Sequence, residues 1–203
     1  MKGKAYFITL EGLEGSGKSS IIRFISKLLR ERKLSFKVYR EPGSTKVGEK
    51  IRKILLDKKN KKLSAHTELL LYLAARTQLI EEKLIKDLEN YDFIICDRFF
   101  DSTLVYQGFG LRLGKIVEWS VKMFSLGLVP NLTLVLDAPP KVGLARLKCK
   151  DRIESRALSF HKRLRRGYLQ LSKRYPQRVE IINANTSLDQ IKKKVAKILR
   201  RVF

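Results

Sequence analysis

The stretch YFITLEGLEGSGKSS, residues 6–20, decides the fold of this chain. Its first five residues are bulky or β-branched and predict a buried strand, while apolar residues at helical spacing follow between residues 21 and 29. Between these two elements, Gly12, Gly17, Lys18 and Ser19 fit the P-loop pattern G-x-x-x-x-G-K-[ST]. A strand, a loop and a helix in this order are the context in which the pattern binds phosphate, so an ordinary glycine-rich turn is the weaker interpretation.

The composition of the loop predicts what it binds. Glycines let successive backbone N–H groups point inward, and the first turn of a helix adds unpaired N–H donors and a positive dipole end. We expect ATP there, with Lys18 at the β- and γ-phosphates and the hydroxyl of Ser19 on Mg²⁺. The predicted nucleotide-binding residues are Gly12, Leu13, Glu14, Gly15, Ser16, Gly17, Lys18, Ser19 and Ser20.

Length and composition indicate one domain. A chain of 203 residues with 44% hydrophobic side chains can bury one core, and no linker or repeat divides residues 1–203. No apolar run approaches the roughly 20 residues of a membrane span, and no cleavable signal is visible, which predicts a cytoplasmic protein. Cys96 and Cys149 lack metal-ligand spacing and are expected to be reduced thiols.

The charge is strongly positive: 44 Lys and Arg against 20 Asp and Glu give +24. Such a surface attracts nucleic acid without sequence specificity. The basic residues are scattered along the whole chain, however, which is more typical of a solvated surface suited to small anionic substrates. A nucleic-acid-binding ATPase is therefore the less favoured alternative.

Strands and helices alternate along the whole chain. This alternation predicts an α/β fold with a parallel β-sheet, helices on both faces, and ligands at the carboxyl ends of the strands. Pro42 and Gly43 end the second strand, and Ser64 is the expected N-cap of a long helix. After the first helix we expect strands at 37–40, 92–97, 132–137 and 179–183. We expect helices at 46–57, 64–91, 115–126 and 140–147, a further helix that ends near 175, and a terminal helix that begins near 188. A looser segment is expected at 101–114.

The strand ends discriminate among P-loop proteins. The segment NKKL at 60–63 lacks the aspartate of a guanine-reading N-K-x-D motif, which disfavours a GTPase. No candidate strand ends in the Asp-Glu pair of motor or clamp-loader ATPases. An arginine directly after Asp97 instead suggests a grip on a second anion, which favours a kinase that phosphorylates another phosphate.

Five short segments, in order along essentially the whole chain, resemble the thymidylate kinase family. They are EGLEGSGKSS (11–20), REPGST (40–45), LYLAAR (71–76), DRFFDSTLVYQG (97–108) and DRIE (151–154). The resemblance implies the nucleoside monophosphate kinase version of the P-loop three-layer fold, ATP and Mg²⁺ as donor and cofactor, dTMP as acceptor with dTDP as product, and a homodimer. A kinase of another monophosphate or of a deoxynucleoside is the alternative.

The resemblance also implies roles for residues around the loop. Glu14 matches an acidic residue near the sugar 3′-hydroxyl and the phosphates, although it could also be a solvated carboxylate. Tyr72 and Arg76 lie four apart on one helix and match the base-stacking aromatic and the helix arginine. A core tyrosine is the alternative for Tyr72.

At the strand ends, Arg40 and Arg98 match arginines that clamp the acceptor phosphate, and ion pairs with Glu41 or Asp97 are the competing interpretation. Asp97 would hold the metal region or orient Arg98. Phe99 departs from the tyrosine or histidine that often follows this Asp-Arg pair, which puts a hydrogen bond there in doubt.

In the segment DSTLVYQG, the resemblance assigns acceptor specificity to three residues. Ser102 and Thr103 match positions facing the thymine edge, although turn residues would look alike. Tyr106 matches an aromatic that crowds the ribose 2′ position and so excludes a 2′-hydroxyl.

A basic segment at about 146–156 is expected to form a mobile lid. The loop's only cation is Lys18, and family members without a loop arginine place a catalytic arginine in the lid. Phosphoryl transfer needs charge neutralisation, which a closing lid supplies while it excludes water. We expect Arg152 first and Arg146 second in this role, against the alternative of a solvated basic turn.

Overall fold

The computed structural model describes residues 5–202 of the chain, and within them five parallel strands form one sheet in the order β2-β3-β1-β4-β5. This is the predicted α/β architecture, and the central strand is the one that leads into the P-loop. The strands are β1 (Tyr6–Gly12), β2 (Phe36–Arg40), β3 (Phe93–Asp97), β4 (Leu132–Asp137) and β5 (Val179–Asn183).

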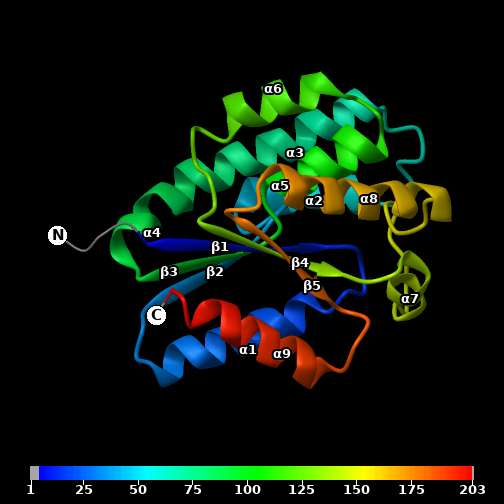
Figure 1. Cartoon of the computed structure of the whole chain (residues 1–203). Coiled ribbons are helices and arrows are strands. Elements are labelled where there is room, and N and C mark those ends of the chain that lie inside the picture. The colour runs from blue at the N-terminus through cyan, green and yellow to red at the C-terminus, as the bar shows by residue number, and fades with distance from the viewer. Residues whose placement is uncertain (1–4, 203) are drawn as a thin grey trace.

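Helices cover both faces of the sheet (Figure 1). One face packs against α1 (Lys18–Glu31) and α9 (Leu188–Leu199). The other packs against a larger layer made of α2 (Lys46–Leu56), α3 (Ala65–Leu79), η1 (Ile80–Leu84), α4 (Ile85–Asn90), α5 (Phe100–Thr103), η2 (Leu104–Gly110), α6 (Lys115–Phe124) and α8 (Leu158–Arg174). The short α7 (Pro140–Ala145) lies at the carboxyl edge of the sheet, beyond β4.

The alternation of side chains along β1 explains the three layers. Ile8 and Leu10 pack with Ile25 of α1 on one face, whereas Phe7 points to the other face and packs with Leu73 of α3. A strand with both faces covered needs apolar residues at nearly every position, as this one has.

Most predicted elements are confirmed to within a few residues. Ser64 is an N-cap, and its hydroxyl accepts a hydrogen bond from the backbone N–H of Thr67. The long helix that it begins continues to Asn90, but it passes through the π-helical segment η1.

The expectation of a looser segment over residues 101–114 is wrong, because α5 and η2 occupy most of it. Asp101 is buried in α5 and accepts hydrogen bonds from Arg178 at 2.6 and 2.8 Å and from Thr133 at 2.9 Å. These partners come from distant parts of the chain. They satisfy a polar side chain that by itself favours a turn over a helix interior.

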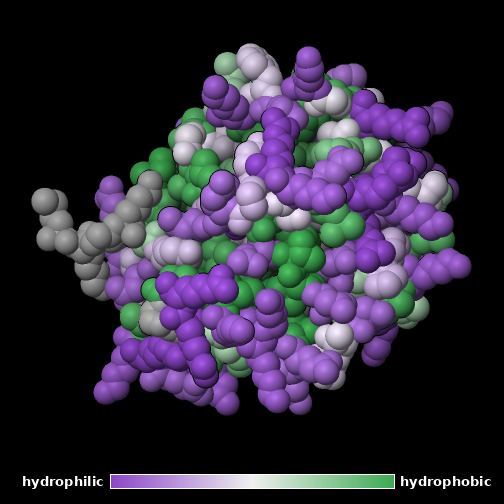
Figure 2. All heavy atoms as spheres, viewed as in Figure 1, coloured by the Kyte–Doolittle hydropathy of each residue, from purple (hydrophilic) through white to green (hydrophobic). Residues whose placement is uncertain are grey.

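The topology gathers the carboxyl ends of β1, β3 and β4 at one edge, where the P-loop begins. Ligands of open α/β sheets bind at such a point. None of the helices in residues 5–202 is long and apolar enough to cross a membrane. The face in Figure 2 is covered mostly by hydrophilic side chains, as expected from the charge of the chain.

Candidate active site

The P-loop backbone has a shape that only glycine allows at two positions. Gly12 has φ of 127°, and a Cβ there would lie 2.5 Å from the carbonyl oxygen of Leu136 in β4. Gly15 has φ of 69°, and its Cβ would lie 2.0 Å from the carbonyl oxygen of Gly143 in α7. The loop is therefore pressed against β4 and against the helix that leads into the lid.

Lys18 begins α1, and its ammonium group curls back over the loop. Nζ donates to the carbonyl oxygens of Gly12 at 3.2 Å and Leu13 at 3.0 Å. Burial, with the nearby charge of Arg98, lowers the pKa of Lys18 to about 8. A partly desolvated ammonium group over the P-loop can bind phosphate oxygens strongly.

Two side chains beside Lys18 fit a magnesium ion carried by a nucleotide. Ser19 exposes its hydroxyl in the first turn of α1, and Asp97 ends β3 with Oδ1 buried and unbonded to any residue in 5–202. The described residues bring no three His, Cys, Asp or Glu side chains together as a metal cage. A Mg²⁺ that takes most of its ligands from phosphates and water needs one hydroxyl and one carboxylate from the protein.

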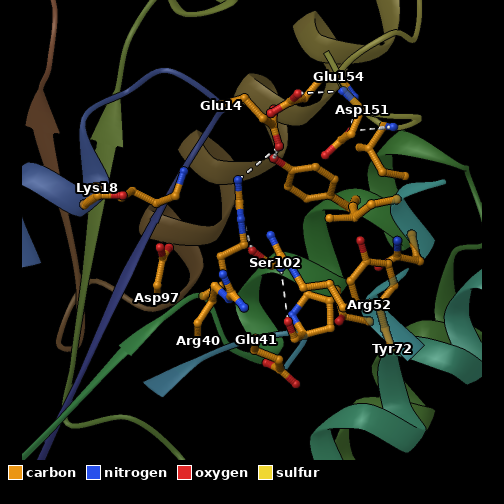
Figure 3. Close-up of a pocket in the computed structure, with 18 of the residues that line it drawn as sticks. Glu14, Lys18, Arg40, Glu41, Arg52, Tyr72, Asp97, Ser102, Asp151 and Glu154 are labelled. Carbon is orange, nitrogen blue, oxygen red and sulfur yellow. Dashed lines mark hydrogen bonds and ion pairs between the residues drawn. The ribbon is translucent and has the colours of Figure 1, made fainter. Parts of the chain in front are cut away.

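A pocket extends from the P-loop to α2 and α3 (Figure 3). Lys18 and Asp97 lie on one side of it, and Arg52 and Tyr72 lie on the other. The sequence-predicted residues that line it are Glu14, Gly15, Lys18, Ser19, Arg40, Tyr72, Asp97, Arg98, Ser102, Thr103 and Tyr106.

Arg98 lines the pocket and connects several of its elements. It adopts φ of 72° after β3, and Nη2 donates to Glu14 Oε1 at 3.0 Å. Its guanidinium also lies 4.9 Å from the ring centre of Tyr106, whose hydroxyl donates to the same carboxylate oxygen. Although burial opposes it, Arg98 holds the pKa of Glu14 below its ordinary value. Arg98 thus pairs with Glu14 and does not need Asp97 as its ion-pair partner.

Glu11, near the end of β1, is a buried carboxylate close to Arg98. It accepts hydrogen bonds from the backbone N–H of Phe99 at 2.8 Å, the Ser102 hydroxyl at 2.6 Å and the Tyr168 hydroxyl at 2.8 Å. These bonds hold the turn after β3 and so position Arg98. The ring of Phe99 packs in the core, so this residue contributes its backbone rather than a polar side chain.

The aromatic and the arginine of α3 separate in the fold. Tyr72 lines the pocket, as the resemblance implies for a base-stacking residue. Arg76 is buried behind the wall, where Nε lies 2.7 Å from Glu41 Oε1 and Nη2 donates to Thr103 Oγ1 at 2.7 Å. Arg76 therefore supports a residue of the pocket wall and does not line the pocket itself.

Two further arginines lie at the pocket. Arg40 ends β2 and pairs with Glu49, not with Glu41, at 2.9 Å. Arg52 of α2 donates to the carbonyl oxygen of Pro42 at 3.1 Å, and the sequence analysis did not single it out. With 44 Lys and Arg in the chain, no local pattern marks this one.

The predicted lid segment, at about 146–156, contains no helix or strand and positions its arginines differently from the prediction. Arg152 is buried, where Nε donates to the Leu55 carbonyl at 2.7 Å and Nη2 to Glu68 at 2.6 Å. It fastens the lid to α2 and α3 and does not line the pocket. Arg146 is exposed, and it donates to the carbonyl oxygen of Gly15 in the P-loop at 3.1 Å.

The lid also brings acidic residues to the pocket that the sequence analysis did not assign. Asp151 and Glu154 line it together with Ile153. Glu154 Oε2 accepts a hydrogen bond from the backbone N–H of Asp151 at 2.8 Å, and this bond stabilises a tight turn in the lid. Both residues belong to the quoted motif DRIE, so the pattern was visible although its role was not.

The sheet order, together with a P-loop lysine and Arg98 lining one pocket, indicates the class, a P-loop nucleotide kinase. A family model for thymidylate kinase matches residues 10–195. The thymidylate kinase of Clostridium novyi is 41% identical over 97% of this chain and 99% of its own, and that of Carboxydothermus hydrogenoformans is 42% identical over 94% of each. The solved thymidylate kinase of Ehrlichia chaffeensis superimposes with a TM-score of 0.79 at 27% identity, over 98% of this chain and 99% of its own. The chain belongs to the thymidylate kinase family and is an enzyme.

Proposed function

We propose that this enzyme transfers the γ-phosphoryl group of ATP to dTMP, giving dTDP for the synthesis of dTTP, with Mg²⁺ as cofactor. An oxygen of the dTMP phosphate forms the new bond to the γ-phosphorus, and the bond from that phosphorus to ADP breaks. The observation that carries the proposal is one pocket with a P-loop lysine on one side and an aromatic ring on the other, joined by Arg98.

On the donor side, the P-loop N–H groups and Lys18 bind the phosphates. Lys18 would exchange its present bonds to the Gly12 and Leu13 carbonyls for phosphate oxygens. Ser19 and Asp97 would hold Mg²⁺, which neutralises charge on the phosphates when it is bound. The transfer of the phosphoryl group needs no strong base, because positioning and electrostatics supply most of its catalysis.

On the acceptor side, Tyr72 offers its ring for stacking on thymine. Thr103, held by Arg76, and Ser102, held by Glu11, would face the edge of the base. Arg98 would clamp the acceptor phosphate with its planar set of donors. Arg40 and Arg52, which line the same pocket, add positive charge to this end. Tyr106 would exclude a 2′-hydroxyl, and Glu14 would meet the 3′-hydroxyl.

For the lid, we propose the reverse of the order expected from sequence. Arg146 already contacts the P-loop through Gly15, so a short movement of an exposed side chain would carry it to the transferred phosphate. Arg152 is bonded to Glu68 and Leu55, and removing it from them would leave Arg156 as the remaining ion-pair partner of the buried Glu68 carboxylate, beside a hydrogen bond from Gln107. Arg146 is thus the better candidate for the catalytic cation, and Arg152 for the anchor of the lid.

We also propose a homodimer formed through α6. Large apolar side chains are exposed on this helix and on the turn after it, and Trp119 is 61% exposed. Exposed apolar side chains gathered on one helix and the residues after it are typical of association sites. The other exposed apolar residues of this surface are Ile116, Met123, Phe124, Leu126 and Val129. A cytoplasmic location and non-specific attraction to nucleic acid stay predictions.

The test is direct detection of the phosphorylated acceptor after ATP and Mg²⁺ are mixed separately with dTMP, dUMP, thymidine, ribo-TMP, dCMP, AMP or GMP. Each monophosphate would give a diphosphate, and thymidine would give dTMP. Fast conversion of dTMP, slower conversion of dUMP and little else is the expected result. Preference for another acceptor would replace the substrate, and no conversion of any acceptor would overturn the proposed reaction.

A further inference from the structure

His161 is a fully buried titratable side chain that the reaction described above does not use. It lies in the first turns of α8, and its ring packs edge-on against Phe160 with centroids 5.4 Å apart. Neither ring nitrogen forms a hydrogen bond of normal length and angle in the described part of the chain, although the backbone of Glu154 and Arg156 in the lid lies close enough to act on the ring. An unmet buried donor or acceptor is destabilising, so such a histidine needs an explanation.

The acidic group that faces His161 is Glu14 of the P-loop. His161 Nδ1 lies 3.8 Å from Glu14 Oε2, which also has no hydrogen-bond partner among residues 5–202. The other oxygen, Oε1, accepts from both Arg98 and Tyr106. The carboxylate is therefore held at one oxygen only, and the second oxygen is the one close to the imidazole.

Three elements meet around this ring. Glu14 comes from the P-loop, Glu154 and Arg156 come from the lid, and His161 itself comes from α8. Burial lowers the pKa of His161 and outweighs Glu14 and the lid backbone, which favour the protonated ring. The charge of Arg156 acts in the same direction as burial. The ring is thus neutral near pH 7 and carries one N–H.

We propose that His161 is a positioning residue for Glu14, whose imidazole N–H donates to Glu14 Oε2 when the lid closes over bound nucleotides. The bond would fix the carboxylate that orients Arg98 and Tyr106. A distance of 3.8 Å exceeds a hydrogen bond by only about 1 Å, a shift that lid closure can supply. The inference deepens the proposed function and rests on it, because Arg98 and Tyr106 line the same pocket.

Two variants of His161 separate positioning from packing. His161→Asn retains an amide N–H near the position of Nδ1 but does not titrate, whereas His161→Leu fills the space without a donor. We expect H161L to lower kcat for dTMP by about 10-fold, as misplacement of a catalytic group does, and H161N to recover most of the loss. His66, the chain's other histidine, is exposed, so H66N is the matched control and should match wild type.

The pH dependence adds a readout that a packing role would not move. Burial lowers the pKa of His161 below its ordinary value of 6.5, and below that pKa the imidazolium would compete with Arg98 for Glu14. Wild-type kcat should therefore fall relative to H161N only as the pH decreases from about 6.5 to the lowest pH at which the enzyme stays folded. A constant ratio across this range, together with equal losses in both variants, would overturn the proposal.

A titration of His161 by proton NMR tests the contact without using activity. The chain has two histidines, so H66N assigns the signals. In Glu14→Gln we expect the pKa of His161 to fall further, since Glu14 favours the protonated ring. An unchanged pKa would overturn the role of His161 alone. Failure of wild type to phosphorylate dTMP would instead overturn the proposed function.

Discussion

Glu14 and Arg98 form a largely buried ion pair in which Arg98 Nη2 lies 3.0 Å from Glu14 Oε1. The first residue belongs to the P-loop, and the second directly follows β3. The pair therefore joins two elements that line the same pocket. Because both charges are poorly solvated, each depends on the other and on the hydrogen bonds around them.

Lys18→Ala should abolish turnover and leave the fold intact. The change removes the only cation of the P-loop, and loss of such charge stabilisation lowers kcat by about 1,000-fold or more. Lys27→Ala, on an exposed position of the same helix, is the control. Steady-state kinetics and thermal unfolding measure the two effects, and substantial residual activity in Lys18→Ala would contradict the role of this residue.

Arg146 and Arg152 should respond in opposite ways. Arg146→Ala removes an exposed side chain, so we expect an unchanged Tm and a kcat lower by about 10-fold or more. Arg152→Ala leaves Glu68 buried with one partner fewer and should cost about 2 kcal/mol of stability. Equal losses of kcat with no change in Tm for either variant would mean that the two roles are assigned wrongly.

Tyr106 should discriminate against ribonucleotides by its ring. Tyr106→Ala opens space beside the sugar, and we expect the preference for dTMP over ribo-TMP to fall by about 10-fold, measured as the ratio of kcat/KM values. Tyr106→Phe keeps the ring and loses the hydrogen bond to Glu14, so it should lower kcat yet keep the preference. Unchanged discrimination in the alanine variant removes Tyr106 from this role.

Glu41 should make stability depend on pH. Burial raises its pKa from 4.5 to about 7, despite Arg76 beside it. Between these values the native state binds more protons than the unfolded state, so the contribution of Glu41 to the free energy of unfolding decreases as the pH rises. The difference between wild type and Glu41→Gln should therefore fall by up to about 3 kcal/mol across this window.

Urea unfolding at several pH values measures this difference. Glu89→Gln, on an exposed position of α4, is the control and should give a curve parallel to wild type. A parallel curve for Glu41→Gln as well would show that Glu41 titrates normally.

Trp119→Glu should separate the proposed dimer. A charge at the centre of the apolar surface on α6 would have to be desolvated in the interface, so we expect a monomer by light scattering. Lys122→Glu changes an exposed position of the same helix and is the control for charge alone. A wild-type monomer at micromolar concentration, or an intact dimer in Trp119→Glu, would exclude this interface.

The local patterns were sufficient for the architecture. Strand ends at Asp97, Asp137 and Asn183 agree with the sequence-based bounds, because a buried parallel strand is an apolar run with a polar end. The same local patterns predict a loose segment after β3, which the structure does not have. Its polar residues favour turns locally, and their partners Glu11, Thr133 and Arg178 are far away in the chain.

The P-loop, the alternating strands and helices and the class of chemistry were thus determined by sequence, since each depends on neighbours within a few residues. Tertiary structure alone decided which arginines face the pocket. It buried Arg76 against Glu41 and Arg152 against Glu68, brought Arg52 to the wall and set His161 beside Glu14. The physical reason is that the partner of a charged side chain is chosen by packing between distant segments, where burial makes an unpaired charge too costly to leave.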